Sequence, residues 1–190
     1  MHADRLFLSV PIPREVKQEI AVIAGHVHDQ LRFSTIAWTP IENYHITLHF
    51  LGDIPRDVQG DFVSDLVAKE FPRQFELRLK EVSAFPNKKN PQTLFVETTV
   101  HPSLLGLRKR VGDVVSSFGM PIDEREWHSH ITIGRVKKRS EILKPEEIPV
   151  KPMKFLVKGF VLMKSMLQSE GSKYELVHRF RLEKKNSKDE

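Results

Sequence analysis

The chain of 190 residues contains no cysteine. This absence excludes disulfide bonds, thiol nucleophiles and zinc sites built from thiolates. Long apolar runs are also missing, since no stretch approaches the roughly 18 residues that a membrane-spanning helix requires. The opening residues 1–5 lack the apolar core of a secretory signal. We therefore expect a protein of the reducing cytoplasm, with no membrane partner.

Domain linkers, low-complexity stretches and long repeats are absent as well. A chain of this length suits one folded domain. We expect a single two-lobed domain over residues 1–183, followed by a charged and frayed tail at residues 184–190.

The charge is unbalanced, with a formal net charge of +5. Lysine and arginine gather at residues 88–89, 108–110, 135–139 and 184–185. Such patches favour a polyanionic partner, and RNA is the obvious candidate. An ordinary solvated surface rich in lysine explains any one cluster equally well.

Hydrophobic periodicity predicts a mixture of helices and strands. We expect strands at 5–10, 75–84, 93–98, 126–136, 155–167 and 174–182, a further strand within 38–51, and a turn at 52–55. Helical spacing marks residues 15–31, 58–67 and 104–118. Neighbouring strands joined by short turns indicate an α+β fold of antiparallel sheets with outer helices.

One short motif occurs twice. His45-Ile46-Thr47-Leu48 returns as His130-Ile131-Thr132-Ile133. Because side chains alternate faces along a strand, each copy presents a histidine and a threonine on one face and aliphatic residues on the other. If the two strands are neighbours, the four polar side chains line one cleft.

Two histidines in one cleft suit the cleavage of a phosphodiester. An imidazole titrates near pH 6.5, so one ring can accept a proton while the other donates one. The hydroxyls of Thr47 and Thr132 can donate hydrogen bonds to phosphate oxygens. The sequence leaves open whether His45 or His130 is the base.

Other interpretations of these histidines exist. A single His-x-Thr on a strand usually belongs to a structural histidine, and only the repeat makes a site the better interpretation. Four histidines share one parity, falling on the same face of the two predicted strands, and could ligate a metal: His45, His49, His128 and His130. No carboxylate shares their spacing, so we expect no metal site. The same parity makes His49 and His128 either cleft residues or exposed ones.

Substrate contacts can also come from neighbouring residues. Arg135 ends the second motif strand and either attracts phosphate or is simply solvated. Phe7, Trp38, Phe85 and Phe95 could stack on a nucleobase, although aromatic residues beside strands more often belong to a core.

With these motifs the chain resembles a known family, the two-histidine phosphoesterases. Within that family it resembles the bacterial and archaeal RNA 2′,3′-cyclic phosphodiesterases, also called 2′–5′ RNA ligases. The likeness covers nearly the whole chain and lies in residues 5–10, 38–40, 43–52, 130–135 and 162–176. Departures occur at His49, where the family often has Lys, and at Ser129, where Pro is common. Gly and Arg, often found near Phe85 in the family, are missing here. None of these departures touches the motif cores.

The resemblance implies two pseudo-symmetric lobes around a concave site, and cofactor-free, metal-independent hydrolysis of RNA or nucleotide 2′,3′-cyclic phosphates to 2′-phosphomonoesters. By this likeness His45 and His130 are the acid–base pair and Thr47 and Thr132 bind the phosphate. Arg135, His49 and Phe7 are candidate substrate contacts. A 2′–5′ ligase acting on tRNA-like halves and a non-catalytic RNA-binding module are the alternatives. Nothing in the sequence requires more than a monomer.

Overall fold

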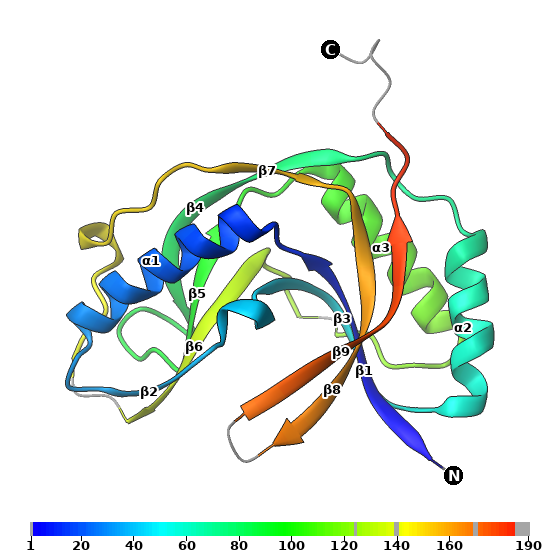
Figure 1. Cartoon of the computed structure of the whole chain (residues 1–190), viewed down its shortest axis with the longest axis horizontal. Coiled ribbons are helices and arrows are strands. Elements are labelled where there is room, and N and C mark those ends of the chain that lie inside the picture. Colours follow the sequence, from blue (N-terminus) through cyan, green and yellow to red (C-terminus); the bar gives the residue numbers. More distant parts are fainter. Residues whose placement is uncertain (1, 124, 139–140, 169–170, 185–190) are drawn as a thin grey trace.

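The computed structural model describes residues 2–123, 125–138, 141–168 and 171–184, and its strands form one strongly curled sheet (Figure 1). All strand pairs are antiparallel. From edge to edge the order is β7 (Lys154–Val157), β4 (Phe75–Phe85), β5 (Thr93–Thr98), β6 (His130–Lys138), β3 (His45–Pro55), β1 (Ala3–Pro11), β8 (Gly159–Gln168) and β9 (Gly171–Arg181), with β2 (Thr35–Trp38) paired to β6.

In the described part of the chain, three helices cover the outside of this sheet: α1 (Arg14–Gln30), α2 (Arg56–Ala68) and α3 (Pro102–Ser117). The same part contains two short 3₁₀ helices in connections, η1 (Ile41–Asn43) and η2 (Pro145–Glu147). The buried positions of α1 recur at helical spacing, which is why this segment forms a helix with one face on the core. Among the described residues, no helix is both long and apolar enough to cross a membrane.

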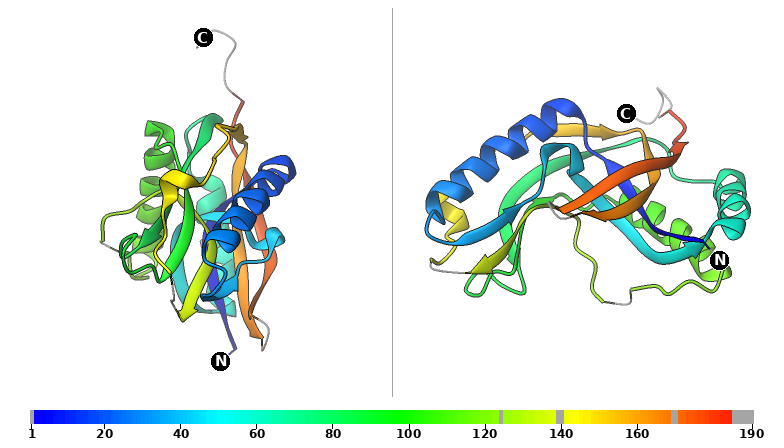
Figure 2. Two further views of the ribbon diagram at one scale, coloured as in Figure 1. Left: turned by 90° about the vertical axis from the view of Figure 1, so that its left-hand side faces the viewer. Right: turned by 60° about the horizontal axis from the view of Figure 1, so that its bottom comes forward.

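Two of the helices cross between the two halves of the sheet. α1 follows β1 in the chain but packs on β6, and α3 follows β5 but packs on β3 (Figures 1 and 2). These two helices therefore cover strands of the other half, whereas α2 follows β3 and packs on it. One continuous apolar core results, which contains buried residues of both α1 and α3.

The two halves of the sheet meet at β3 and β6. Across the described residues of these strands the register contains one pair, Ile46 opposite Ile131, and both side chains are fully buried. The core at this junction thus holds the two strands together, although they share little of a hydrogen-bonded ladder.

The predicted α+β, two-lobed architecture is confirmed, with three corrections. The turn expected at residues 52–55 lies inside β3, because Gly52 adopts a φ of 77° and the chain stays paired with β1 through a bulge. The strand expected from residue 126 begins only at His130. The strand expected at 155–167 is divided at Lys158, because β7 pairs with β4 whereas β8 pairs with β1 across the sheet. The tail residues 185–190 lie outside the described part.

Gly159 allows a close approach between β8 and β9. A Cβ atom there would lie 2.1 Å from the Phe180 carbonyl oxygen. We expect Gly159→Ala to lower the free energy of unfolding by about 3 kcal/mol, at the upper end for overpacking. Urea unfolding measures this change. Gly60→Ala is the matched control: it lies in α2 with nothing within 4 Å of the added Cβ, so it should raise stability by about 0.5–1 kcal/mol. Equal midpoints for the two variants would contradict this account.

Candidate active site

The junction of β3 and β6 brings the two motifs together. Because Ile46 lies opposite Ile131 in an antiparallel pair, His45 neighbours Thr132 and Thr47 neighbours His130. All four polar side chains are half-buried, on the face opposite the two isoleucines. Diagonal neighbours in such a ladder lie about 7–8 Å apart. The two imidazoles therefore flank a space suited to one phosphate group.

Both imidazoles are oriented in the same way. The Nδ1 atom of His45 lies 2.7 Å from the carbonyl oxygen of Asn43, and that of His130 lies 2.7 Å from the carbonyl oxygen of His128. A carbonyl oxygen only accepts, so Nδ1 of each ring carries the proton and donates it. Nε2 is then the nitrogen left for chemistry in each ring, and that of His45 lies 3.1 Å from Thr47 Oγ1.

Burial controls the charge of the pair. It lowers the pKa of His45 to about 4, and the nearby charge of Lys17 contributes in the same direction. Burial also lowers the pKa of His130, assisted by His128 and Arg135. Carbonyl hydrogen bonds oppose these shifts without overcoming them. Both rings are consequently neutral in the free protein at pH 7.

A hollow of 560 Å³ opens beside His45, between η1 and the strands β1, β8 and β9. The ring of Phe7 lies 5.0 Å from the ring of His45, and the ring of Tyr174 lies 5.5 Å from it. Lys17 and Arg179 supply positive charge to the lining. We define these residues as the His45 hollow, a space with aromatic walls and cationic groups.

A second hollow of 500 Å³ lies on the other side, along β4, β5 and the turn between them. The ring of Phe85 meets the ring of His130 edge-on at 5.1 Å, and Phe95 also lies 5.1 Å from His130. Lys88, Lys89 and His128 belong to this lining. It is called the His130 hollow below. Each catalytic candidate therefore has its own aromatic surroundings.

His49 does not face the cleft, so the parity argument is wrong for this residue. The β1–β3 register shifts between Ser9–Thr47 and Leu8–His49, which makes Leu48 an extra residue and turns His49 toward α3. Its side chain is buried, and Nε2 donates to the Arg108 carbonyl oxygen at 2.8 Å. A substrate in the cleft cannot reach it.

The other candidate contacts divide into two groups. Arg135 is exposed and donates to the Thr93 hydroxyl at 3.2 Å, and its charge acts on His130, so it lies at the cleft. His128 is exposed beside Phe85. The ring centroid of Trp38 instead lies 6.0 Å from that of His28 in α1, so Trp38 lies on the side of the sheet that the helix covers, as a core aromatic residue would.

Three groups at the cleft are not among the site residues that the sequence predicts. Lys17 belongs to the first turn of α1, Tyr174 belongs to the terminal hairpin, and both reach His45 only through the fold. The backbone carbonyls that orient the histidines come from residues two positions earlier, where any side chain would serve.

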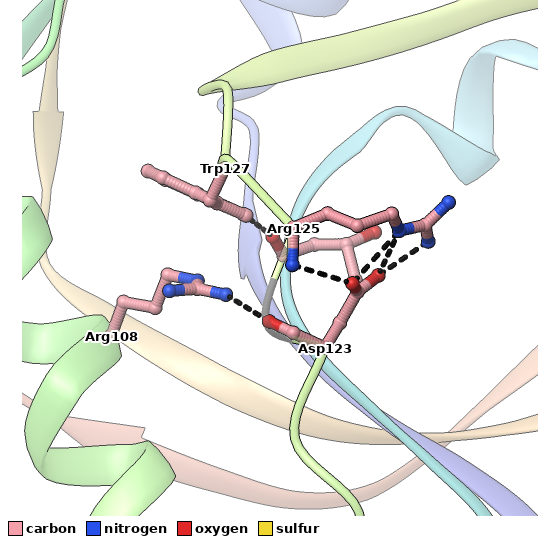
Figure 3. Close-up of polar contacts among 5 residues, drawn as sticks. Arg108, Asp123, Arg125 and Trp127 are labelled. Atoms are coloured by element: carbon pink, nitrogen blue, oxygen red, sulfur yellow. Dashed lines mark hydrogen bonds and ion pairs between the residues drawn. The ribbon is translucent and has the colours of Figure 1, made fainter.

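Trp127 connects the segment before β6 to the first motif strand. Its indole N–H donates to the Thr47 carbonyl oxygen at 3.1 Å. The Arg108 guanidinium lies 5.2 Å from the Trp127 ring centroid and donates to the Asp123 carbonyl oxygen at 3.4 Å (Figure 3). Arg125 pairs with the Asp123 carboxylate at the surface. Trp127 thus adds a second connection between the two motifs.

In the parts of the chain that the structure describes, no three histidine, aspartate or glutamate side chains converge closely enough to hold a metal ion. His49 and His128, which share the parity of the motif histidines, lie apart from each other. One is buried beneath α3 and the other is exposed beside Phe85.

Comparison with known proteins identifies similar chains. The family model described as "LigT like Phosphoesterase" matches residues 10–96. An RNA 2′,3′-cyclic phosphodiesterase of Methanocaldococcus jannaschii is 30% identical over 179 residues, covering 91% of this chain and 98% of that protein. One of Geobacillus stearothermophilus is 30% identical over 188 residues and 96% of this chain, which spans 58% of that protein's length.

Solved structures agree in fold. The protein TT0787 of Thermus thermophilus superposes with a TM-score of 0.81 at 25% identity, covering 96% of this chain and 100% of that one. The E. coli LigT structure with 3′-AMP gives a TM-score of 0.79 at 20% identity, covering 95% and 99%.

We expect Trp127→Phe to lower the free energy of unfolding by about 1–2 kcal/mol, because the Thr47 carbonyl loses its indole donor while the aromatic ring against Arg108 is kept. Denaturant unfolding measures the change. Arg125→Gln is the control, since it removes only an exposed ion pair, which is worth about 0–1 kcal/mol. A Trp127→Phe protein as stable as the parent would show that this connection contributes nothing.

Proposed function

Because the chain belongs to the LigT-like family of RNA 2′,3′-cyclic phosphodiesterases, hydrolases of phosphodiester bonds, we propose that it converts 2′,3′-cyclic phosphate ends of RNA to 2′-phosphomonoesters with His45 and His130 as its acid–base pair. One observation carries the proposal: in both rings Nδ1 donates to a backbone carbonyl, so both Nε2 atoms are left for proton transfer.

The proposed reaction has one displacement step. A water molecule attacks the phosphorus while the unprotonated Nε2 of one histidine accepts its proton. The bond between phosphorus and the 3′ oxygen breaks, and the protonated Nε2 of the other histidine donates its proton to that oxygen. The products are a 2′-phosphomonoester and a 3′-hydroxyl. The reactive form is therefore the one in which a single imidazole is protonated.

Threonines and cations would stabilise the charge that develops on the phosphate. Thr47 and Thr132 neighbour the two histidines across the strand pair, and each hydroxyl can rotate to donate to a non-bridging oxygen. In the free protein the Thr47 hydroxyl lies against His45, so a bound phosphate would replace this contact. Lys17 and Arg135 bring positive charge to opposite ends of the pair.

One chain supplies every group in this scheme, so the proposed enzyme acts as a monomer. Its proposed setting is the cytoplasm, because a chain without cysteine forms no disulfide bond and so does not depend on an oxidising compartment. Proton transfer by two histidines requires no metal ion.

The first test is turnover of cytidine 2′,3′-cyclic phosphate with EDTA present. We expect a 2′-phosphate product, and we expect His45→Asn and His130→Asn each to lower kcat by about 10²–10⁴, the usual worth of one acid or base. Chromatography against 2′- and 3′-phosphate standards identifies the product.

His26→Asn is the matched control, because that exposed histidine lies on α1 outside the cleft. It should leave turnover unchanged. Near-normal rates in either cleft variant, or a 3′-phosphate product, would overturn the mechanism.

The pH profile supplies a second test. Since burial lowers the pKa of both imidazoles, the singly protonated pair is most populated below pH 6.5. We expect kcat/KM to reach its maximum there and to fall at higher pH, as the remaining proton leaves. A bound phosphate anion raises both pKa values, so the kcat profile should lie at higher pH.

Lys17→Met should move the limb of the kcat/KM profile that reports His45 to higher pH, because the charge of Lys17 lowers the pKa of His45. Both rates are measured across pH 4–8. If the kcat and kcat/KM profiles coincide, and Lys17→Met shifts neither of them, this electrostatic description is contradicted.

A further inference from the structure

We propose that the His130 hollow binds the nucleotide on the 5′ side of the one that carries the cyclic phosphate. The preferred substrate is then an RNA end of at least two nucleotides, rather than a cyclic mononucleotide. This inference rests on the proposed function and assigns a substrate class to the same cleft.

The hollow lies on the same face of the sheet as the histidines. β5 pairs Phe95 with Thr132 and Thr93 with Arg135, and β4 pairs Phe85 with Thr93. Directly opposed residues share a face. The floor of the hollow is therefore continuous with the phosphate position between His45 and His130.

Phe85 has the properties of a stacking platform. Its ring is half-buried and packs on Phe95, with the ring centroids 4.3 Å apart. The same ring contacts His130 and His128 on its other sides. A ring held in place by three neighbours loses little freedom when a base stacks on it, and every base offers a π-face.

Positive charge stands at the rim of the hollow. Lys88 and Lys89 are exposed in the turn after Phe85, and this turn is ordered by its own hydrogen bonds. The Asn87 side-chain oxygen accepts the backbone N–H groups of Lys89 and Asn90 at 3.0 and 2.9 Å. Lys88 makes an exposed ion pair with Glu81 at 3.7 Å, a weak contact that a phosphodiester can replace.

Each of the two histidines has its own pair of aromatic rings, which is why we infer that two nucleosides bind. Phe7 and Tyr174 surround His45, whereas Phe85 and Phe95 surround His130. One nucleoside has one base and can occupy only one of these hollows. The lining of the His45 hollow includes His45 itself, whereas His130 is not part of the lining of the other hollow, so we assign the terminal nucleoside to the His45 hollow and the preceding one to the His130 hollow.

The experiment compares cytidine 2′,3′-cyclic phosphate with the dinucleotide that carries adenosine on the 5′ side of the same cyclic cytidine. For the parent protein we expect a higher kcat/KM with the dinucleotide. In Phe85→Leu this dinucleotide-to-mononucleotide ratio should fall about tenfold, the worth of one stacked base. Any disturbance of His130 acts on both substrates and cancels in the ratio.

Lys88→Met is a second variant that removes no packing. The salt dependence of kcat/KM for the dinucleotide should become shallower by about 0.7 in its log–log slope, as for one lost phosphate contact on a single strand. The mononucleotide slope should not change. Phe33→Leu and Lys109→Met are matched controls, because both residues are exposed outside the two hollows.

Each outcome decides the matter. An absent dinucleotide advantage, or a ratio unchanged in Phe85→Leu together with an unchanged salt slope in Lys88→Met, overturns the inference while mononucleotide turnover still supports the proposed function. Loss of mononucleotide turnover in Phe85→Leu with an unchanged ratio would place the terminal base in this hollow and overturn the inference as well. No turnover of either substrate by the parent protein would instead count against the proposed function.

Discussion

The cleft depends on one cross-strand contact, the pairing of Ile46 with Ile131 at the junction of β3 and β6. Both side chains are fully buried, which holds the register because a slip by one residue would move an isoleucine to the polar face and a histidine into the core. The same register places His45 beside Thr132 and Thr47 beside His130. A hydrophobic contact on one face of the sheet thus sets the geometry of the polar groups on the other.

The electrostatic design follows from what orients the rings. Catalytic histidines are often held by a carboxylate, which favours the protonated form, whereas here both rings donate to backbone carbonyls. Burial then dominates and keeps the pKa of each ring low. Both rings are neutral in the free protein, so an anionic phosphate bound between them would favour the protonation of one ring.

The doubled motif predicted much of this arrangement from sequence, because strand alternation alone places His and Thr on one face. It failed for His49, since a bulge at Leu48 changes the facing of the residues that follow it up to a second bulge at Leu51, and no local sequence pattern marks either bulge. Lys17, Tyr174 and Trp127 reach the motifs from a helix, a hairpin and a loop. Contacts between segments so distant in sequence depend on the curl of the sheet, which periodicity does not reveal.

The crossed helices have a consequence for how the molecule holds together. β1, α1 and β3 form one half, while β5, α3 and β6 form the other; α1 packs on β6 and α3 packs on β3, whereas α2 stays on β3. Because one apolar core contains buried residues of both α1 and α3, we expect the two halves to unfold in one cooperative transition. A change that loosens either half would then disturb both histidines.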